Sequence, residues 1–289
     1  PFLDIYVTDK GSRRKVDHSF KLKGDINSIY HDGPVAITND GKTMYFSRNA
    51  ANKFGKETDK KGISHMGIYK ATFKDSIWTD VEKLAISNND YSVQHPALNK
   101  DNSRLYFSSD MPGGEGGSDI YYVDLNIADS LRVPQNLGKV VNTKDTEGTP
   151  FMNNEGILFF SSDGHFGLGL LDVFGTISDE NGGIVDVVNL GIPVNSERDD
   201  FSFTMNQDGL TGYFASNRRG GRGSDDIYEY YRKPLLNVRG QVVDAINTKP
   251  VANSEVKLID ADGNEIANML TDKDGFYEIN IDRNKDYKI

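Results

Sequence analysis

The stretch from Pro96 to Tyr121, PALNKDNSRLYFSSDMPGGEGGSDIY, decides the fold because its parts recur along the chain. It joins a short apolar segment, a polar turn, an aromatic strand and a glycine-rich connection, and it ends in the tripeptide DIY. Versions of that tripeptide begin at residues 4, 67, 119, 172 and 226. A unit copied at a period near fifty residues is typical of a β-propeller or another closed array.

Two further landmarks recur between the tripeptides in a constant order. One is an aromatic pair followed by a small residue: Tyr45-Phe46-Ser47, Tyr106-Phe107-Ser108, Phe159-Phe160-Ser161 and Tyr213-Phe214-Ala215. The other is a leucine with an asparagine five residues later: Leu22/Asn27, Leu84/Asn89, Leu137/Asn142 and Leu190/Asn195. The order predicts four antiparallel strands in each copy, which is the blade of a propeller.

The first and last copies lack parts of this pattern. The first has only its third and fourth strands, and the last ends after its third strand, near Tyr231. We therefore predict an all-β fold with a five-bladed β-propeller over residues 1–233, its first blade completed by residues upstream of Pro1. The alternative is a four-bladed ring that pairs the N-terminal outer strand with the last copy, but it leaves the strand at Asp4-Ile5-Tyr6 without a place.

The period stops at Pro234, and a second pattern fills residues 234–289. Val238, Gly240 and Val242 alternate with polar residues, which indicates strands with one buried face. Asp262-Gly263 and Asp274-Gly275 are turn signals between such strands. We predict a small antiparallel β-sandwich that is truncated at its C-terminal end.

Composition narrows the functional classes. The 289 residues carry a formal net charge of -10, which disfavours nucleic acid as a partner because phosphate binding needs a basic face. The absence of cysteine excludes disulfides and thiolate metal sites. No apolar run approaches twenty residues, so no transmembrane segment is predicted. Pro1 lies in the middle of a repeat, so the missing signal peptide carries no information.

The motifs resemble two known families. Residues 1–233 are similar to the TolB-like, WD-like propeller repeats of bacterial envelope proteins, in the order Pro, Asp-Gly, Tyr-Phe-Ser-Ser, Ser-Asp-Ile-Tyr. Residues 236–289 resemble the carboxypeptidase regulatory-like domain, a transthyretin-like sandwich, through Val-x-Gly-x-Val and Thr-Asp-x-x-Gly-x-Tyr-like patterns.

The order of the two domains resembles the OmpA-family envelope proteins of Bacteroidota, including PorE-like components of type IX secretion. The resemblance implies a periplasmic scaffold associated with the outer membrane. Its implied partners are outer-membrane or secretion-system proteins, and peptidoglycan is bound only through a domain outside this chain. A carbohydrate-binding or carbohydrate-processing propeller at the cell surface is the alternative, and it needs a concave cluster of exposed aromatic side chains.

We predict that the chain is not an enzyme and has no catalytic, cofactor or metal residues. No Gly-x-Ser-x-Gly elbow is present, and His31 and His95 lie near equivalent strand starts, which favours packing or an inner-rim position over a triad. The recurring Asp119, Asp172 and Asp226 suit turn capping better than metal binding, because the second copy has glycine there.

Partner binding is predicted at basic residues that the repeat does not require. One group is a loop of the last copy; the other lies in an insertion between residues 48 and 66, which is longer than the equivalent connections. The candidates are Arg218, Arg219, Arg222, Lys53, Lys56, Lys60 and Lys61.

Overall fold

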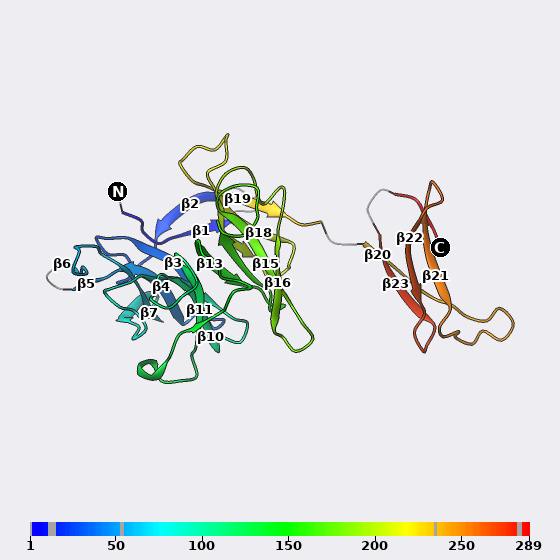
Figure 1. The fold of residues 1–289 in the computed structure, drawn as a ribbon, viewed down its shortest axis with the longest axis horizontal. Coiled ribbons are helices and arrows are strands. Elements are labelled where there is room, and N and C mark those ends of the chain that lie inside the picture. The colour runs from blue at the N-terminus through cyan, green and yellow to red at the C-terminus, as the bar shows by residue number, and fades with distance from the viewer. Residues whose placement is uncertain (1, 11–15, 53–54, 234–235, 282–284) are drawn as a thin grey trace. The chain divides into compact units, whose positions relative to one another are not determined.

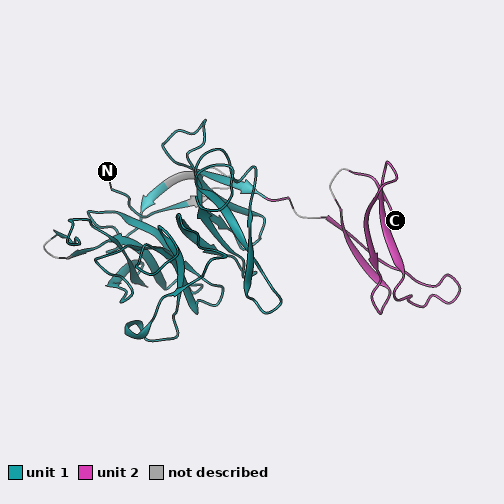
Figure 2. Cartoon of the chain, viewed as in Figure 1, with its two compact units in different colours: residues 1–231 teal, residues 232–289 magenta. Residues whose placement is uncertain are grey.

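The structure is a computed structural model, and it describes residues 2–10, 16–52, 55–233, 236–281 and 285–289 (Figure 1). The chain forms two compact units, Pro1–Tyr231 and Arg232–Ile289 (Figure 2). Strands account for almost all regular structure, and the short 3-10 turn η1 (Asp129–Leu131) is the single helical segment of the described ranges. In those ranges no helix is long and apolar enough to cross a membrane.

The three middle copies each form a four-stranded antiparallel sheet of their own. The second copy contributes β3 (Asp32–Ile37), β4 (Thr43–Asn49), β7 (Met66–Lys74) and β8 (Ile77–Lys83). The third contributes β9 (Val93–Leu98), β10 (Arg104–Ser109), β11 (Asp119–Asp124) and β12 (Gln135–Asn136). The fourth contributes β13 (Glu147–Met152), β14 (Leu158–Ser162), β15 (Asp172–Ser178) and β16 (Ile184–Asn189).

The end copies are smaller, as the sequence pattern predicts. The first is the pair β1 (Tyr6–Lys10) and β2 (Val16–Lys21), and the last is the three-stranded sheet of β17 (Asp200–Met205), β18 (Thr211–Ser216) and β19 (Asp226–Tyr231). Among the described strands β2 pairs with β1 alone, so the four-bladed pairing of the N-terminal strand with the last copy is not formed. The sheets remain separate, and the count of five blades stays a prediction.

The aromatic pairs lie on the second strand of each sheet, as predicted. In the third copy Phe107 is fully buried against Ile68 of the second copy, while its neighbour Tyr106 packs with Leu158 of the fourth. The two rings take opposite faces because successive strand residues alternate. Each of the three middle sheets therefore contributes to the apolar cluster on either side of it, and the repeat unit is held together by cores between neighbouring copies.

In three of the four copies that carry the leucine–asparagine landmark, the asparagine fastens the third strand, whereas in the second copy Ser87 Oγ, instead of Asn89, bonds to Ile68. Asn142 accepts the N–H of Ile120 at 2.7 Å and donates to its carbonyl oxygen at 3.0 Å. Asn195 holds Val173, and Asn27 holds Ile5, in the same way. Buried main-chain groups need such partners, so the landmark is explained by the structure of the blade.

The second unit contains two small sheets around one apolar cluster. One sheet pairs β20 (Leu236–Gln241) with β23 (Phe276–Ile281), and the other has the order β22 (Glu265–Leu270), β21 (Glu255–Asp260), β24 (Tyr287–Lys288). Val256, Leu258 and Ile279 form the buried centre. The predicted turns at Asp262-Gly263 and Asp274-Gly275 close the β21–β22 connection and precede β23.

Candidate functional site

The innermost strands of the repeat unit carry one irregular residue each. His95, Thr149 and Ser202 have φ values of 57°, 44° and 53°, and each lies in a β-bulge of β9, β13 or β17. Positive φ is uncommon for residues other than glycine, and for the β-branched Thr149 it is a true outlier. Such conformations persist where the surroundings impose them, and they gather at functional positions.

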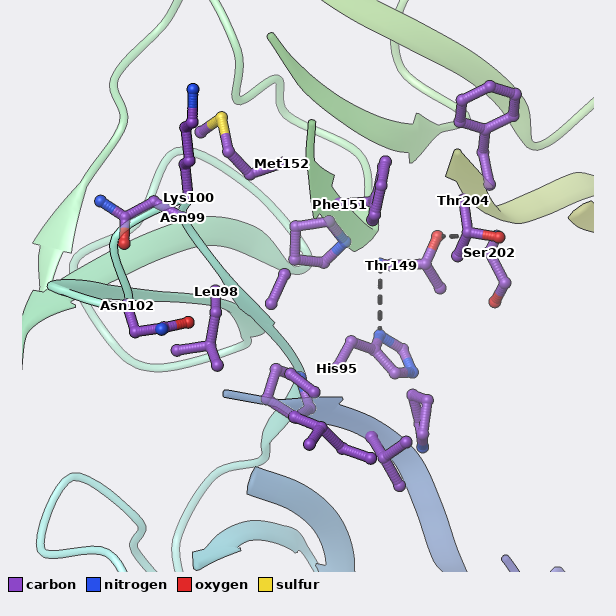
Figure 3. A pocket seen from close by; sticks show the side chains of 18 of the residues that line it. His95, Leu98, Asn99, Lys100, Asn102, Thr149, Phe151, Met152, Ser202 and Thr204 are labelled. Carbon is purple, nitrogen blue, oxygen red and sulfur yellow. Dashed lines mark hydrogen bonds between the residues drawn. The ribbon is translucent and has the colours of Figure 1, made fainter. Parts of the chain in front are cut away.

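These bulges are joined by hydrogen bonds that run from copy to copy. Ser47 Oγ of the second copy accepts the N–H of His95 at 2.9 Å. His95 Nδ1 accepts the N–H of Thr149 at 3.3 Å, and Thr149 Oγ1 accepts the N–H of Ser202 at 3.1 Å. Figure 3 shows the two bonds that join His95, Thr149 and Ser202. We call this series the waist.

The waist fixes the protonation state of His95. The amide of Thr149 can only donate, so Nδ1 must be the unprotonated acceptor and the ring proton lies on Nε2. Ser108 Oγ lies 3.1 Å from the same Nδ1, where it too can donate. Burial lowers the pKa of His95 to about 4, because the charged imidazolium is poorly solvated there. His95 is therefore neutral at pH 7.

A cavity of about 320 Å³ opens on one side of the waist. Its wall contains one apolar side chain from the end of each of three inner strands: Ile37, Leu98 and Met152. Its rim contains side chains of the turns that follow these strands, namely Asn39, Asn99, Lys100, Asn102 and Asn154. Figure 3 shows Leu98, Met152 and several of the rim side chains around the cavity. We call this cavity the mouth.

The mouth combines an apolar wall with amide groups at its edge. Ile37 is 45% exposed, whereas the lining ring of Phe203 is 3% exposed and Phe151 is half-buried. The mouth therefore lacks the cluster of exposed aromatic faces that the carbohydrate alternative requires. Pockets of this composition bind an apolar group in the wall and orient it through a few polar contacts.

A second cavity of about 800 Å³ lies on the other side of the waist. Residues of the waist line both cavities, and the lining of the second extends from Ile5 and Tyr6 in the first copy to Ile227 in the last. We call it the gap.

The recurring aspartates close the glycine-rich connections. Asp119 accepts the amides of Glu115 and Gly116, and Asp226 accepts those of Arg222 and Gly223. Asp172 does the same in the fourth copy. Within the described ranges no three His, Asp or Glu side chains are grouped to hold a metal ion.

The structure separates the three arginines that the sequence placed in one patch. Arg218 donates to the fully buried carboxylate of Asp200 and to the carbonyl oxygens of Pro193 and Val194. Its guanidinium also lies 4.8 Å from the ring centroid of Phe214. Arg218 is thus part of the blade, whereas Arg219 and Arg222 are exposed.

The insertion contains the small hairpin β5 (Ala51–Asn52) and β6 (Gly55–Lys56), and Lys56 ends its second strand. Lys56 Nζ lies 5.0 Å from the ring centroid of Tyr30. Lys60 and Lys61 are exposed, and Lys53 lies outside the described residues. None of the three described lysines lines the waist or the mouth.

The waist residues Thr149 and Ser202 and the amides of the mouth were not among the predicted site residues. A signal for one of them, Thr149, exists in the sequence, because a polar residue precedes a proline at Thr149-Pro150 as at His95-Pro96. Proline restricts the residue before it, so a repeated polar-Pro pair marks a special backbone position.

No family model matches the chain, and no curated protein matches it either. Solved structures do match in fold. TolB from Acinetobacter baumannii is 13% identical with a TM-score of 0.48, over 94% of this chain and 59% of that one. A putative TolB from Agrobacterium tumefaciens is 13% identical with a TM-score of 0.46, over 93% and 80%. The chain thus spans less than two thirds of the Acinetobacter protein.

Enzymes are also among the similar structures, and they correct one prediction. An α-L-arabinofuranosidase from Lactobacillus brevis is 14% identical with a TM-score of 0.46, over 81% of this chain and 80% of that one. A gluconolactonase and puromycin-hydrolysing and prolyl peptidases match as well. The prediction that the chain is not an enzyme was therefore wrong to exclude catalysis, since this fold also carries enzymes. Similarity at this level concerns the fold alone.

Proposed function

We propose that the chain is a periplasmic interaction module whose mouth binds an extended segment of a partner protein. The observation that carries the proposal is the exposed side chain of Ile37 beside Leu98 and Met152 in a cavity edged by amides. An apolar side chain of the partner fits between these three residues. The asparagines of the rim can donate to and accept from the partner's main chain, as an extended peptide requires.

The arrangement of an apolar wall inside a rim of amide side chains favours a peptide over a small apolar ligand. Asn39 already donates to the carbonyl oxygen of Lys100 at 2.6 Å, which links the turns of two copies at the rim. A ligand that forms hydrogen bonds to these turns therefore contacts several copies at the same time. His95, which lines the mouth, is neutral and brings no positive charge to it.

The wider setting is part of the same proposal. We propose that residues 1–233 belong to a five-bladed propeller, that residues 234–289 are a transthyretin-like sandwich, and that both belong to an OmpA-family protein of the outer membrane. Its partners would be outer-membrane components, including those of type IX secretion. Arg219, Arg222, Lys60 and Lys61 are proposed as secondary contacts, because they are exposed charges without a role in the repeat.

The test compares two isoleucines of similar exposure. Ile37 is 45% exposed and lines the mouth, whereas Ile77 is 41% exposed on β8 and does not. Ile37→Asp should reduce co-purification of envelope partners at least tenfold, and Ile77→Asp should leave it unchanged. Both variants should retain the melting temperature of the parent within a few degrees, because exposed substitutions change stability little.

Equal partner recovery from the two folded variants would refute the proposal. Loss of binding to a soluble oligosaccharide in Ile37→Asp, with protein partners retained, would instead assign the mouth to carbohydrate. Reversal of Arg219 and Arg222 to Glu tests the secondary contacts separately, with Arg218 left in place to preserve the blade.

A further inference from the structure

We infer that the gap is an acceptor site for a β-hairpin that carries the inner-strand pattern of this repeat. The site concerns the face between the last and the first copy, away from the mouth, and it rests on the five-blade arrangement proposed above. Five observations support it.

The first is an apolar residue left uncovered. Ile68, Ile120 and Val173 hold the same place on the third strand of successive copies, and each is 0% exposed. The next copy covers them: Ile120, for example, packs with Leu158 and Phe160. The last copy places Ile227 at this position, where it is 79% exposed.

The second observation is an aromatic residue on the opposite side of the gap. In every copy that has a second strand, the aromatic residue after that position packs on a phenylalanine of that strand. The ring centroids are 6.0 Å apart for Phe46–Tyr69, 6.0 Å for Phe107–Tyr121, 5.9 Å for Phe160–Phe174 and 5.6 Å for Phe214–Tyr228. Tyr6 takes this place in the first copy. It is 56% exposed, and no described phenylalanine packs on it.

The third observation is an unpaired strand edge. β11 and β15 are each paired on both sides, whereas β1 is paired only with β2 among the described strands. The free edge of β1 can accept another strand by main-chain hydrogen bonds. Tyr6 on this strand and Ile227 on β19 line the same cavity, so one inserted element would contact both.

The fourth observation is the end of the waist. Ser47, His95 and Thr149 each accept a hydrogen bond from the main-chain N–H of the bulge residue in the next copy. Ser202 is the last member, and its Oγ bonds to no described residue. An inner strand in the gap would place its own bulge amide against Ser202 Oγ and extend the series by one step.

The fifth observation is an equivalence of main-chain contacts at the start of each third strand. Ser118 O accepts the amide of Glu147 at 2.6 Å, and Leu171 O accepts that of Asp200 at 2.7 Å. Leu3 O accepts the amide of Asp32 at 2.9 Å in the same manner. The first copy is thus docked on the second as the third and fourth copies are docked on their successors, and its two inner strands are not among the described strands.

These observations specify the occupant. It is a pair of antiparallel strands whose second strand pairs with β1, stacks a phenylalanine on Tyr6 and covers Ile227 with an apolar side chain. The hairpin Val93–Ser109 of this chain has that pattern. A second copy of the chain can supply such a hairpin only by unfolding one of its own blades, because those hairpins are already buried between neighbours.

The experiment uses the absence of cysteine from the chain. Ile227→Cys introduces a single thiol on the open face. A second protein also carries Ile227→Cys, and in it residues 93–118 replace residues 1–3 in front of Asp4. This addition rebuilds a whole copy, because Asp4 corresponds to Asp119. A matched control carries Leu105→Asp and Phe107→Asp in the added hairpin only. The rate of thiol labelling is measured in all three proteins.

The inference predicts rapid labelling in the unextended chain, labelling at least tenfold slower in the extended chain, and rapid labelling in the control. Tethering the hairpin raises its effective concentration, so weak binding of a free peptide does not limit the result. Equal rates in the extended chain and the control would overturn the inference. Slow labelling of the unextended chain that depends on protein concentration would also overturn it, in favour of a second copy. The mouth is intact in all three proteins, so partner binding there is measured independently.

Discussion

The junction between the third and fourth copies and the face beyond the fifth present the same residues in different surroundings. Ile120 is buried by Leu158 and Phe160 at the junction, whereas Ile227, its counterpart, is exposed. Each of the two strands pairs with the second strand of its own copy in the same register. The comparison teaches that the strands of a copy form from their own sequence, but that its core exists only where a neighbour is present.

The largest difference is expected for the aromatic residues on the two sides of this comparison. Phe107 is fully buried, so Phe107→Ala should reduce the free energy of unfolding by about 3–5 kcal/mol. Tyr6→Ala removes an exposed ring and should cost less than about 1 kcal/mol. Urea unfolding of the two variants measures both values. A small loss for Phe107→Ala would remove it from the core between copies.

Substitutions on the inner side of the last copy should reduce stability as much as substitutions in the interior, although no neighbouring copy covers its other face. Arg218→Ala leaves the buried carboxylate of Asp200 without its charged partner and should cost about 3 kcal/mol. Arg219→Ala changes an exposed neighbour in the same loop and should cost less than about 0.5 kcal/mol. Thermal unfolding compares them, and equal losses would show that Arg218 does not act in the blade.

The waist should make stability depend on pH. The pKa of His95 is about 4 in the folded chain against an ordinary 6.5, so the unfolded chain binds the proton first as the pH falls. The buried, neutral His95 therefore contributes fully to the free energy of unfolding above pH 6.5. This contribution, about 3 kcal/mol in total, is lost as the pH falls from 6.5 to about 4.

Protonation also removes the acceptor for Thr149, which joins two copies. The measurement is the free energy of unfolding at pH 7, 5.5 and 4.5 in the parent and in His95→Gln. The difference between the two proteins should shrink as the pH falls. Ser202→Ala, at the open end of the waist, should show the parent's pH dependence. A parallel pH dependence in parent and His95→Gln would contradict this account of His95.

The sequence predicted the parts of the fold that repeat. The landmarks at Phe107, Asn142 and Asp119 recur because most copies use a core ring, a fastening amide and a turn cap at these places, so their spacing exposes their role. Arg218 repeats the role of Arg48, which pairs with the buried Asp32 of the second copy, but the two arginines lie at different distances in sequence from their aromatic pairs, so the repeat did not reveal it. Arg218 looked like one of three surface charges, because nothing in the sequence shows that its partner Asp200, 18 residues away, is buried.

The candidate site was predicted less well for a related reason. The mouth is assembled from Ile37, Leu98 and Met152, which lie more than fifty residues apart in sequence and meet only when the copies are arranged side by side. The waist depends on backbone conformation, and only the proline after His95 and after Thr149 hints at it. The prediction about catalysis was wrong because absence of a motif was read as absence of a function.

The central claim is that the core of each copy is completed by its successor. The most direct test replaces the two counterparts by the same residue and measures the free energy of unfolding of each variant. Ile120→Ala should lose about 2–5 kcal/mol, as expected for a buried isoleucine. Ile227→Ala should lose less than about 0.5 kcal/mol, because its side chain is already in water. Equal losses in the two variants would contradict the claim.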